Sequence, residues 1–217
     1  MREVFQQELR EVQDRLVDIA ELVERSIEQA TRAFNESNVS LAEQVIIEDH
    51  AIDQAALALD ELAIRILARQ QPVARDLRIV VSALRVSASL ERMGDLAEHI
   101  AQLARYRFPE KVVPASLRDT FYELGQLDVA IARKLTRLLK TEDLELAEEI
   151  RNDDDRIDEL HVGVFDAVLG ETWKGAAVDT VDATLASRYH ERFADHAVGI
   201  AKNIQYLATG DFSKVEA

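Results

Sequence analysis

The sequence predicts an all-α protein made of two tandem antiparallel three-helix bundles, and composition, periodicity and an internal repeat lead to this fold class. Hydrophobic residues make up 47% of the 217-residue chain, which is enough for a substantial core, and there are only 7 glycines and 3 prolines. So few turn-forming residues argue against a fold of many short strands. Apolar residues also recur at every third or fourth position through long segments, which is the spacing of one helix face.

The first three helices are predicted from this periodicity and from the residues that interrupt it. The first covers residues 2–36, and a turn over residues 35–40 follows it. A capping box formed by Ser40 and Glu43 is expected to open the second helix, which ends near residue 70, just before Pro72. The third runs from about residue 73 to 108 and stops at Pro109.

The second half of the chain repeats this pattern. After a linker that extends to Pro114, the fourth helix begins within residues 116–119, and a break at 141–143 separates it from the fifth. The fifth helix is expected to end near Trp173, a predicted packing residue, and the sixth follows Gly175 and reaches residue 208, with Gly210 as its stop signal. Long helices with short turns pack as antiparallel neighbours. We therefore expect residues 1–109 to form the first bundle and 110–217 the second.

The charge balance limits the classes of partner. The chain has 26 basic and 41 acidic residues, a net charge of −15, which argues against nucleic acid as a partner. It has no cysteine, which excludes disulfides and thiolate metal sites. The N-terminus lacks the apolar region of a signal peptide, and no run approaches a membrane span, so we expect a cytoplasmic protein. No glycine-rich loop or basic pocket for phosphate is recognisable.

Two acidic phrases occur twice. ERMGDLAEHIA at residues 91–101 and ERFADHAVGIA at 191–201 share six of eleven positions. The pattern Asp-x-x-Ile-Asp likewise begins at Asp49 and again at Asp154. Residues four apart lie on one helix face, where two like charges repel each other. Acidic pairs at this spacing are common in so acidic a chain, so any single pair taken alone is most simply a solvated helix face.

The positions of these pairs predict two clusters of four carboxylates. The pair at 49 and 53 and the pair at 91 and 95 are almost equally far along the chain from the turn between the second and third helices. The same holds in the second half, for the pairs at 154 and 158 and at 191 and 195. Antiparallel packing therefore brings the two acidic pairs of each half to the same height along the bundle. We expect them in open grooves, where the acids are largely exposed. Four close carboxylates repel unless a cation neutralises them, and oxygen ligands suit Mg²⁺, Mn²⁺, Ca²⁺ or iron.

The two phrases resemble the Glu-Arg-Ile-Gly-Asp-x-Ala-x-Asn-Ile-Ala signature of the PhoU family, the regulatory proteins of phosphate-specific transport. The segment PVARDLR at 72–78 is also similar to the start of that family's third helix. The resemblance implies a cytoplasmic, non-enzymatic protein with a multinuclear metal cluster of iron, manganese, magnesium or zinc. The ligands carried over are Asp49, Asp53, Glu91 and Asp95 in the first bundle, and Asp154, Asp158, Glu191 and Asp195 in the second.

The resemblance also implies negative regulation of phosphate uptake and of the phosphate-starvation response. The implied partners are the ATPase subunit of the phosphate ABC transporter and the sensor histidine kinase of the phosphate regulon, with membrane association only through them. A homodimer is expected, which an exposed apolar remainder of the first and fourth helices would support. Two alternatives stay open: a carboxylate-bridged metalloenzyme, which needs a closed pocket, and a purely structural helical adaptor, which needs no metal.

The sequence departs from the family signature at one position in each copy. The asparagine of the signature is His99 in the first copy and Gly199 in the second. His99 is a candidate substitute ligand, although a packed or surface histidine is the more common role, and His161 is a weaker candidate at the second cluster. Arg92 and Arg192 are expected to form surface salt bridges. The two sites should therefore not be equivalent.

Overall fold

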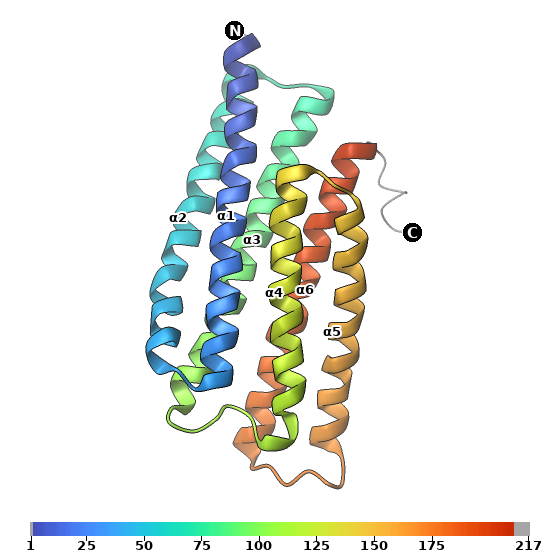
Figure 1. The fold of residues 1–217 in the computed structure, drawn as a ribbon. Coiled ribbons are helices and arrows are strands. Elements are labelled where there is room, and N and C mark those ends of the chain that lie inside the picture. The colour runs from blue at the N-terminus through green and yellow to red at the C-terminus, as the bar shows by residue number, and fades with distance from the viewer. Residues whose placement is uncertain (1, 211–217) are drawn as a thin grey trace.

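The computed structural model of the protein describes residues 2–210, and this part of the chain consists of helices joined by turns, without a strand (Figure 1). The elements are α1 (Arg2–Glu36), α2 (Val39–Gln70), α3 (Ala74–Arg107), the 3₁₀ turn η1 (Ala115–Leu117), α4 (Arg118–Thr141), α5 (Glu145–Leu169) and α6 (Ala177–Thr209). Within residues 2–210, no helix has the length and apolar character needed to cross a lipid bilayer. The all-α prediction and the predicted order of six long helices are confirmed.

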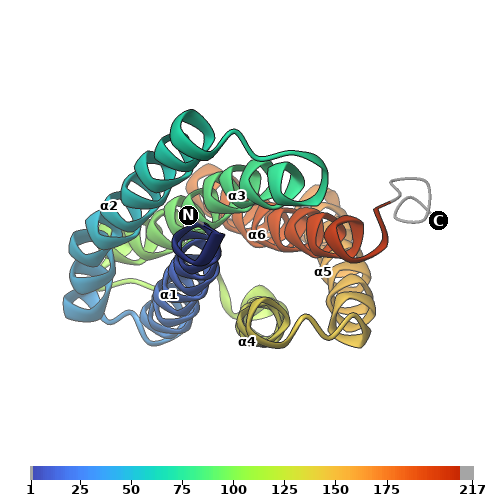
Figure 2. The ribbon, with the colours of Figure 1, turned by 90° about the horizontal axis from the view of Figure 1, so that it is seen from above.

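The helices form two three-helix bundles packed side by side. Helices α1, α2 and α3 pack against one another, and so do α4, α5 and α6. The bundles meet through two helix pairs, α3 with α6 and α1 with α4. Seen from above in Figure 2, α1 and α4 lie on the same side of the α3–α6 pair, with α2 and α5 at the two flanks. The internal repeat predicted from the sequence is thus visible in the architecture.

A single apolar core runs through both bundles. The predicted seam of α1 is buried, since Val12, Leu16, Ile19, Val23 and Ile27 are at most 4% exposed. Because α1 also packs against α4, much of the apolar surface of these helices is used within the chain. Their expected exposed remainder is small: in the described part of the chain, Val4 and Tyr122 are the large apolar side chains of α1 and α4 that are exposed.

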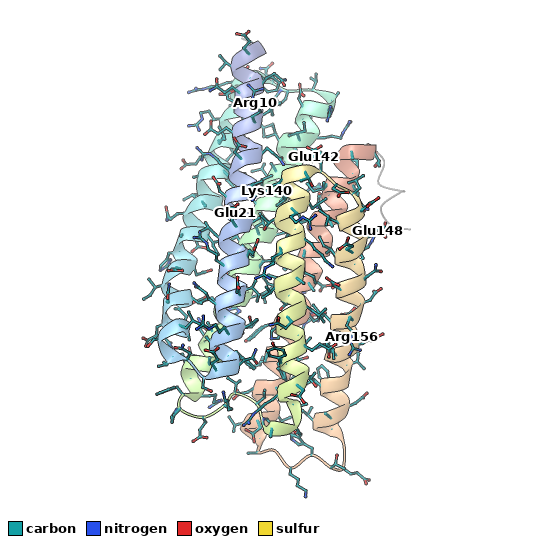
Figure 3. All side chains as sticks on the ribbon, viewed as in Figure 1. Arg10, Glu21, Lys140, Glu142, Glu148 and Arg156 are labelled. Carbon is teal, nitrogen blue, oxygen red and sulfur yellow. The ribbon has the colours of Figure 1, made fainter. Side chains whose placement is uncertain are left out.

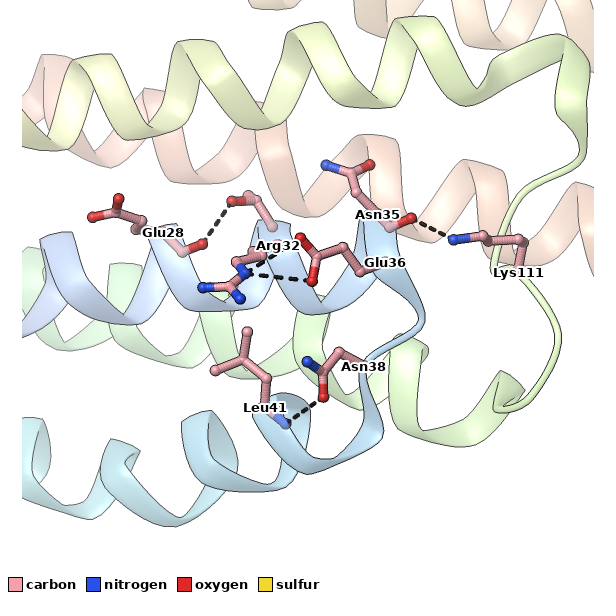
Figure 4. Close-up of polar contacts among 8 residues, drawn as sticks. Glu28, Arg32, Asn35, Glu36, Asn38, Leu41 and Lys111 are labelled. Carbon is pink, nitrogen blue, oxygen red and sulfur yellow. Dashed lines mark hydrogen bonds and ion pairs between the residues drawn. The ribbon is translucent and has the colours of Figure 1, made fainter.

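Two helix ends differ from the prediction. The N-cap of α2 is Asn38, whose side chain accepts a hydrogen bond from the Leu41 amide at 3.1 Å (Figure 4). The Ser40 capping box is therefore wrong, because Ser40 already lies in the first turn of the helix. Helix α5 ends at Leu169 rather than near Trp173.

Trp173 instead packs in the turn between α5 and α6. Its indole N–H donates to Thr180 Oγ1 at 2.9 Å, and a Cβ added to Gly175 would come within 2.4 Å of its ring. A glycine is therefore needed beneath the ring, and the predicted packing role of Trp173 is confirmed. The predicted stop of α6 is also confirmed, since Gly210 adopts a left-handed φ of 72° and its amide donates to the Tyr206 carbonyl.

Two buried polar pairs lie at or near the interface between the bundles, and neither was signalled by the sequence. Arg107 near the end of α3 forms a two-pronged ion pair with Asp182 of α6, whose side chain is 4% exposed. Deeper in the interface, His190 of α6 contacts Asp128 of α4 at 2.6 Å, and both side chains are at most 1% exposed. The His190 ring also lies 6.4 Å from that of Phe34 on α1, so this pair sits where three helices from both bundles meet.

Candidate metal centre

The first predicted carboxylate cluster is assembled by α2 and α3. Asp49, Asp53 and Asp95 each offer a carboxylate oxygen, and these three oxygens lie within 4.8 Å of one another. Glu91 joins them electrostatically. Burial raises the pKa of Glu91, and the negative charges of Asp95 and Asp53 raise it further. The tertiary structure therefore brings all four acids to one level of the bundle, as their spacing from the hairpin turn predicted.

The cluster is less open than expected because Asp49 is buried. This residue is 8% exposed, whereas the side chains of Asp53 and Asp95 are 43% and 25% exposed. The reason is the close approach of α2 to α3 at Gly94, in the middle of the first phrase. A Cβ at Gly94 would lie 2.9 Å from Ile52 Cδ1 and 3.1 Å from Asp49 Oδ1. Glycine thus allows the two helices to enclose one carboxylate of the cluster.

This enclosure perturbs the protonation of Asp49. Burial raises its pKa to about 7, and the neighbouring charges of Asp53, Glu98 and Asp95 contribute in that order. Glu98 was missed by the sequence analysis, although its position three residues after Asp95 places it on the same helix face. The second phrase has Val198 at the corresponding position, so this fifth acid belongs to the first cluster.

The second cluster is built in the same way by α5 and α6 but is looser. The pKa of Asp154 is raised to about 7, chiefly by burial and then by the negative charges of Asp158 and Asp195. The pKa of Glu191 is raised by burial and then by Asp195. Asp158 and Asp195 are exposed. Among residues 2–210, three acidic side chains with oxygens within 4.8 Å occur in the first cluster and not in the second.

A basic side chain accompanies each cluster. Arg92 donates to Asp95 at 2.6 Å and lies 3.7 Å from Glu91, which confirms its predicted role as a surface salt bridge. In the second cluster it is Arg188, and not Arg192, that pairs with Glu191. Each arginine neutralises only part of its cluster, because one positive charge faces at least four carboxylates.

The rings of the histidines considered as extra ligands pack against neighbouring aromatic side chains. The His99 ring packs 5.1 Å from that of Tyr189 on α6, in the interface between the bundles. His161 Nδ1 lies 2.6 Å from Ser187 Oγ, and its ring meets Phe165 edge-on at 5.0 Å. Both geometries favour packing roles over ligation. At position 199 a Cβ would meet nothing within 4 Å, so that glycine is not required by close packing.

The donor set fits a hard metal cation. One buried oxygen of Asp49, one of Asp154 and one of Glu191 have no hydrogen-bond partner in the structure, so each has lone pairs free to bind a cation. A cation would satisfy these oxygens and neutralise the like charges that raise the pKa values. Carboxylate-only sites suit Mg²⁺, Ca²⁺ and Mn²⁺, and carboxylate clusters also hold iron in helical bundles.

Comparisons with known proteins place this arrangement in context. The model of the PhoU domain matches residues 16–104 and again 121–204. The chain is 39% identical over 212 residues to a phosphate-specific transport system accessory protein, PhoU homolog 1, from Mycobacterium leprae, with 98% of this chain and 96% of that protein covered. It is 38% identical to PhoU homolog 2 from Mycobacterium tuberculosis, with 98% and 100% covered.

Solved structures give the same result. The crystal structure of PhoU from Pseudomonas aeruginosa is similar with a TM-score of 0.87 and 28% identity, covering 95% of this chain and 100% of that one. The phosphate transport system regulatory protein PhoU from Streptococcus pneumoniae matches with a TM-score of 0.85 and 25% identity, covering 96% and 98%. The six-helix arrangement and its division into two repeats are therefore shared with these proteins.

Proposed function

This chain belongs to the PhoU family of phosphate-specific transport accessory proteins, and from this premise we propose that it is a metal-binding, non-enzymatic regulator that restrains phosphate uptake. It would keep the phosphate-starvation response off when phosphate is plentiful. The observation that supports the metal part is the first cluster, where oxygens of Asp49, Asp53 and Asp95 lie within 4.8 Å of one another and one buried oxygen of Asp49 is unpaired.

The proposed ligands are the eight acids of the two clusters. A bound cation supplies positive charge that no described side chain provides in full, and the carboxylates of α2 and α3, or of α5 and α6, supply the oxygens. Asp49 and Asp154 would hold the cation from the buried side, whereas Asp53 and Asp158 approach it from solvent. Since each cluster draws on two helices, ligation would fix the separation of those helices and the shape of the surface around them.

The proposed partners are the ATPase subunit of the phosphate transporter and the sensor histidine kinase of the phosphate regulon, contacted in the cytoplasm by a homodimer. Membrane association would then be indirect. The family membership supports this assignment in its coarse form, an accessory role in phosphate-specific transport.

The metal proposal is tested by metal content. Purified protein loaded with Mn²⁺ or iron and then dialysed should retain metal in elemental analysis. The double variant Asp53→Asn, Asp95→Asn should lose the metal of the first cluster. The variant Asp166→Asn serves as the control, because it removes one exposed carboxylate of α5 outside both clusters. Equal metal content in the two variants would show that the acids are only solvated helix faces, as in a structural adaptor.

The regulatory proposal is tested separately in cells. Deleting the gene should raise phosphate uptake and derepress phosphate-starvation genes in phosphate-rich medium, and the wild-type gene should reverse both effects. The cluster variant should fail to complement if metal is needed for regulation. Unchanged uptake and expression after deletion would contradict the regulatory role, whatever the metal content of the protein.

A further inference from the structure

A cavity of about 330 Å³ lies between the two bundles, well away from both acidic clusters. Its walls come from α1 and α3 of the first bundle and from α6 and the α4–α5 turn of the second. In Figure 1 this is the end of the molecule where α1 and α3 begin and α6 ends. Small-molecule sites have volumes of this order and occur preferentially where domains meet.

Two arginines from different helices line this cavity. They are Arg10 of α1 and Arg75 of α3. Within the described residues, neither guanidinium takes part in a hydrogen bond or an ion pair, although the chain has 41 acidic residues. A guanidinium is planar and presents several donors in a fork that matches phosphate oxygens. The two free arginines therefore give the cavity an anion-binding side.

The charge of one segment beside the cavity strengthens this preference. Residues 62–90, which form the end of α2 and the start of α3, contain five arginines and one aspartate, so this segment has a charge of 5 − 1 = +4 in a chain of net charge −15. A local positive field in an otherwise acidic protein raises the concentration of anions at that place. This basic segment was not apparent from the overall composition.

The rest of the lining fits an organic group. Leu9, Ile79 and Leu207 form an apolar wall, which inorganic phosphate would leave uncovered. Asp76 and Glu142 add carboxylate acceptors suited to sugar hydroxyls. Figure 3 labels Arg10 near the start of α1 and Glu142 in the α4–α5 turn, both toward this end of the molecule.

The internal repeat shows that this lining is not a necessity of the fold. The two phrases begin at residues 91 and 191, so the counterpart of Leu207 on α6 is Arg107 on α3. Arg107 is not part of an apolar wall, because it forms the ion pair with Asp182 that ties the bundles together. The two ends of the interface therefore have different chemistry at this position.

We propose that this cavity binds a small organic phosphate of the nucleoside monophosphate class. The phosphate lies on Arg10 and Arg75, the base covers the apolar wall, and the ribose hydroxyls donate to Asp76 or Glu142. Because the walls belong to both bundles, the ligand stabilises one arrangement of the bundles relative to each other. This inference does not depend on the proposed metal sites or on the regulatory role.

The experiment is calorimetric titration of the full chain with AMP in the presence of EDTA, so that no metal in the acidic clusters can hold the phosphate. The variant Arg10→Gln, Arg75→Gln should weaken AMP binding about tenfold or more, the loss expected for charge-assisted hydrogen bonds. The control is Arg65→Gln, Arg69→Gln, which removes the same charge from the same end of the molecule at exposed positions outside the cavity. It should change the affinity by no more than about twofold, allowing for screened long-range charge effects.

Further titrations separate the parts of the ligand. Adenosine and inorganic phosphate should each bind about tenfold or more weakly than AMP, because each contacts only one side of the cavity. Leu207→Trp, which fills the apolar side, should abolish AMP binding while circular dichroism shows an intact fold. The proposal is overturned by an absence of AMP binding, by equal losses in the two arginine variants, or by phosphate binding as tightly as AMP.

Discussion

Replacing Asp49 by asparagine should stabilise the metal-free protein at alkaline pH and abolish its stabilisation by metal. Asp49 is 8% exposed and shares its cluster with Asp53, Glu98 and Asp95, so its charge is held in an unfavourable place when no cation is present. Asparagine keeps the size of the side chain and removes the charge, and its amide can donate to the remaining carboxylates. The perturbation therefore isolates the electrostatic cost of this one group.

The direction and size of the effect follow from the pKa of Asp49. Its pKa is about 7 in the folded protein and about 3.9 for an unperturbed aspartate. Between these pH values the folded state binds more protons than the unfolded state, so the free energy of unfolding falls as the pH rises from about 4 to about 7. At about 1.4 kcal/mol per pH unit, ionisation of Asp49 lowers the free energy of unfolding by at most about 4 kcal/mol. Since a buried asparagine also loses hydrogen bonds to water, we expect a gain of about 1–3 kcal/mol.

Urea denaturation in EDTA at pH 5 and pH 8 measures this gain. The Asp49→Asn variant should exceed the wild type at pH 8 and approach it at pH 5, whereas Asp166→Asn should follow the wild type at both. Saturating Mn²⁺ should reverse the order at pH 8, because a ligand at a hundred times its Kd adds about 2.7 kcal/mol to the protein that binds it. If Asp49→Asn is no more stable than the wild type at pH 8 in EDTA, Asp49 is not an electrostatically strained group.

Three further predictions concern close packing between helices and the two buried polar pairs. Gly94→Ala should destabilise the fold by about 1–3 kcal/mol in urea melts and weaken metal binding, because its Cβ would lie 2.9 Å from a neighbouring side chain. Gly199→Ala, whose Cβ would contact no atom within 4 Å, should be neutral or stabilising by up to about 1 kcal/mol. His190→Leu alone should cost about 3 kcal/mol or more at pH 8 by leaving Asp128 buried and unpaired. The deficit should shrink as the pH falls, because burial raises the pKa of Asp128 and the variant lacks the histidine that lowers it. The double variant Asp128→Val, His190→Leu should recover most of this loss, and failure to recover would show that the pair is needed for packing. Arg107→Gln should cost about 1–3 kcal/mol in the same measurement, and no loss would mean that its ion pair is not stabilising.

The choice of valine and leucine in the double variant comes from the internal repeat. Helices α1 and α4 end at residues 36 and 141, a spacing of 105 that equals the spacing of Asp49 and Asp154. The counterpart of Asp128 is thus Val23 (128 − 105 = 23), and that of His190 is Leu90 (190 − 100 = 90). Both counterparts are at most 1% exposed, so the same place in the first bundle is filled by apolar side chains.

Much of the fold and part of the site were predictable from local patterns. The apolar seam of α1, the turns at Pro72 and Gly210, and the repeated phrases determined six helices in two bundles. The level of the two acidic clusters followed from counting residues to the hairpin turn, because an antiparallel helix pair has a fixed rise per residue. These predictions succeeded because they depend on periodicity within a helix and on short connections.

The helix ends were harder to predict because the cap depends on backbone geometry. Both Asn38 and Ser40 are residues that favour an N-cap, and the hydrogen bond from the Leu41 amide to the Asn38 side chain shows that the first of them is used. Helix α5 ends at Leu169, before Gly170, and Trp173 beyond it donates a hydrogen bond to Thr180 of α6. Neither choice is decided by the residue types alone.

By itself, the sequence determined the helical class, the repeat, and which acids share a helix face and a level. Only the tertiary structure decided that Asp49 is buried, that His99 packs against Tyr189, and that Arg107 pairs with Asp182. It also decided that Arg10 and Arg75, which belong to different helices, line one cavity. The physical reason is that helix periodicity fixes the direction of each side chain around its own helix axis. Burial and charge pairing depend instead on the distance between the axes of neighbouring helices. That distance is set by small residues such as Gly94 and by the packing of every helix in the two bundles.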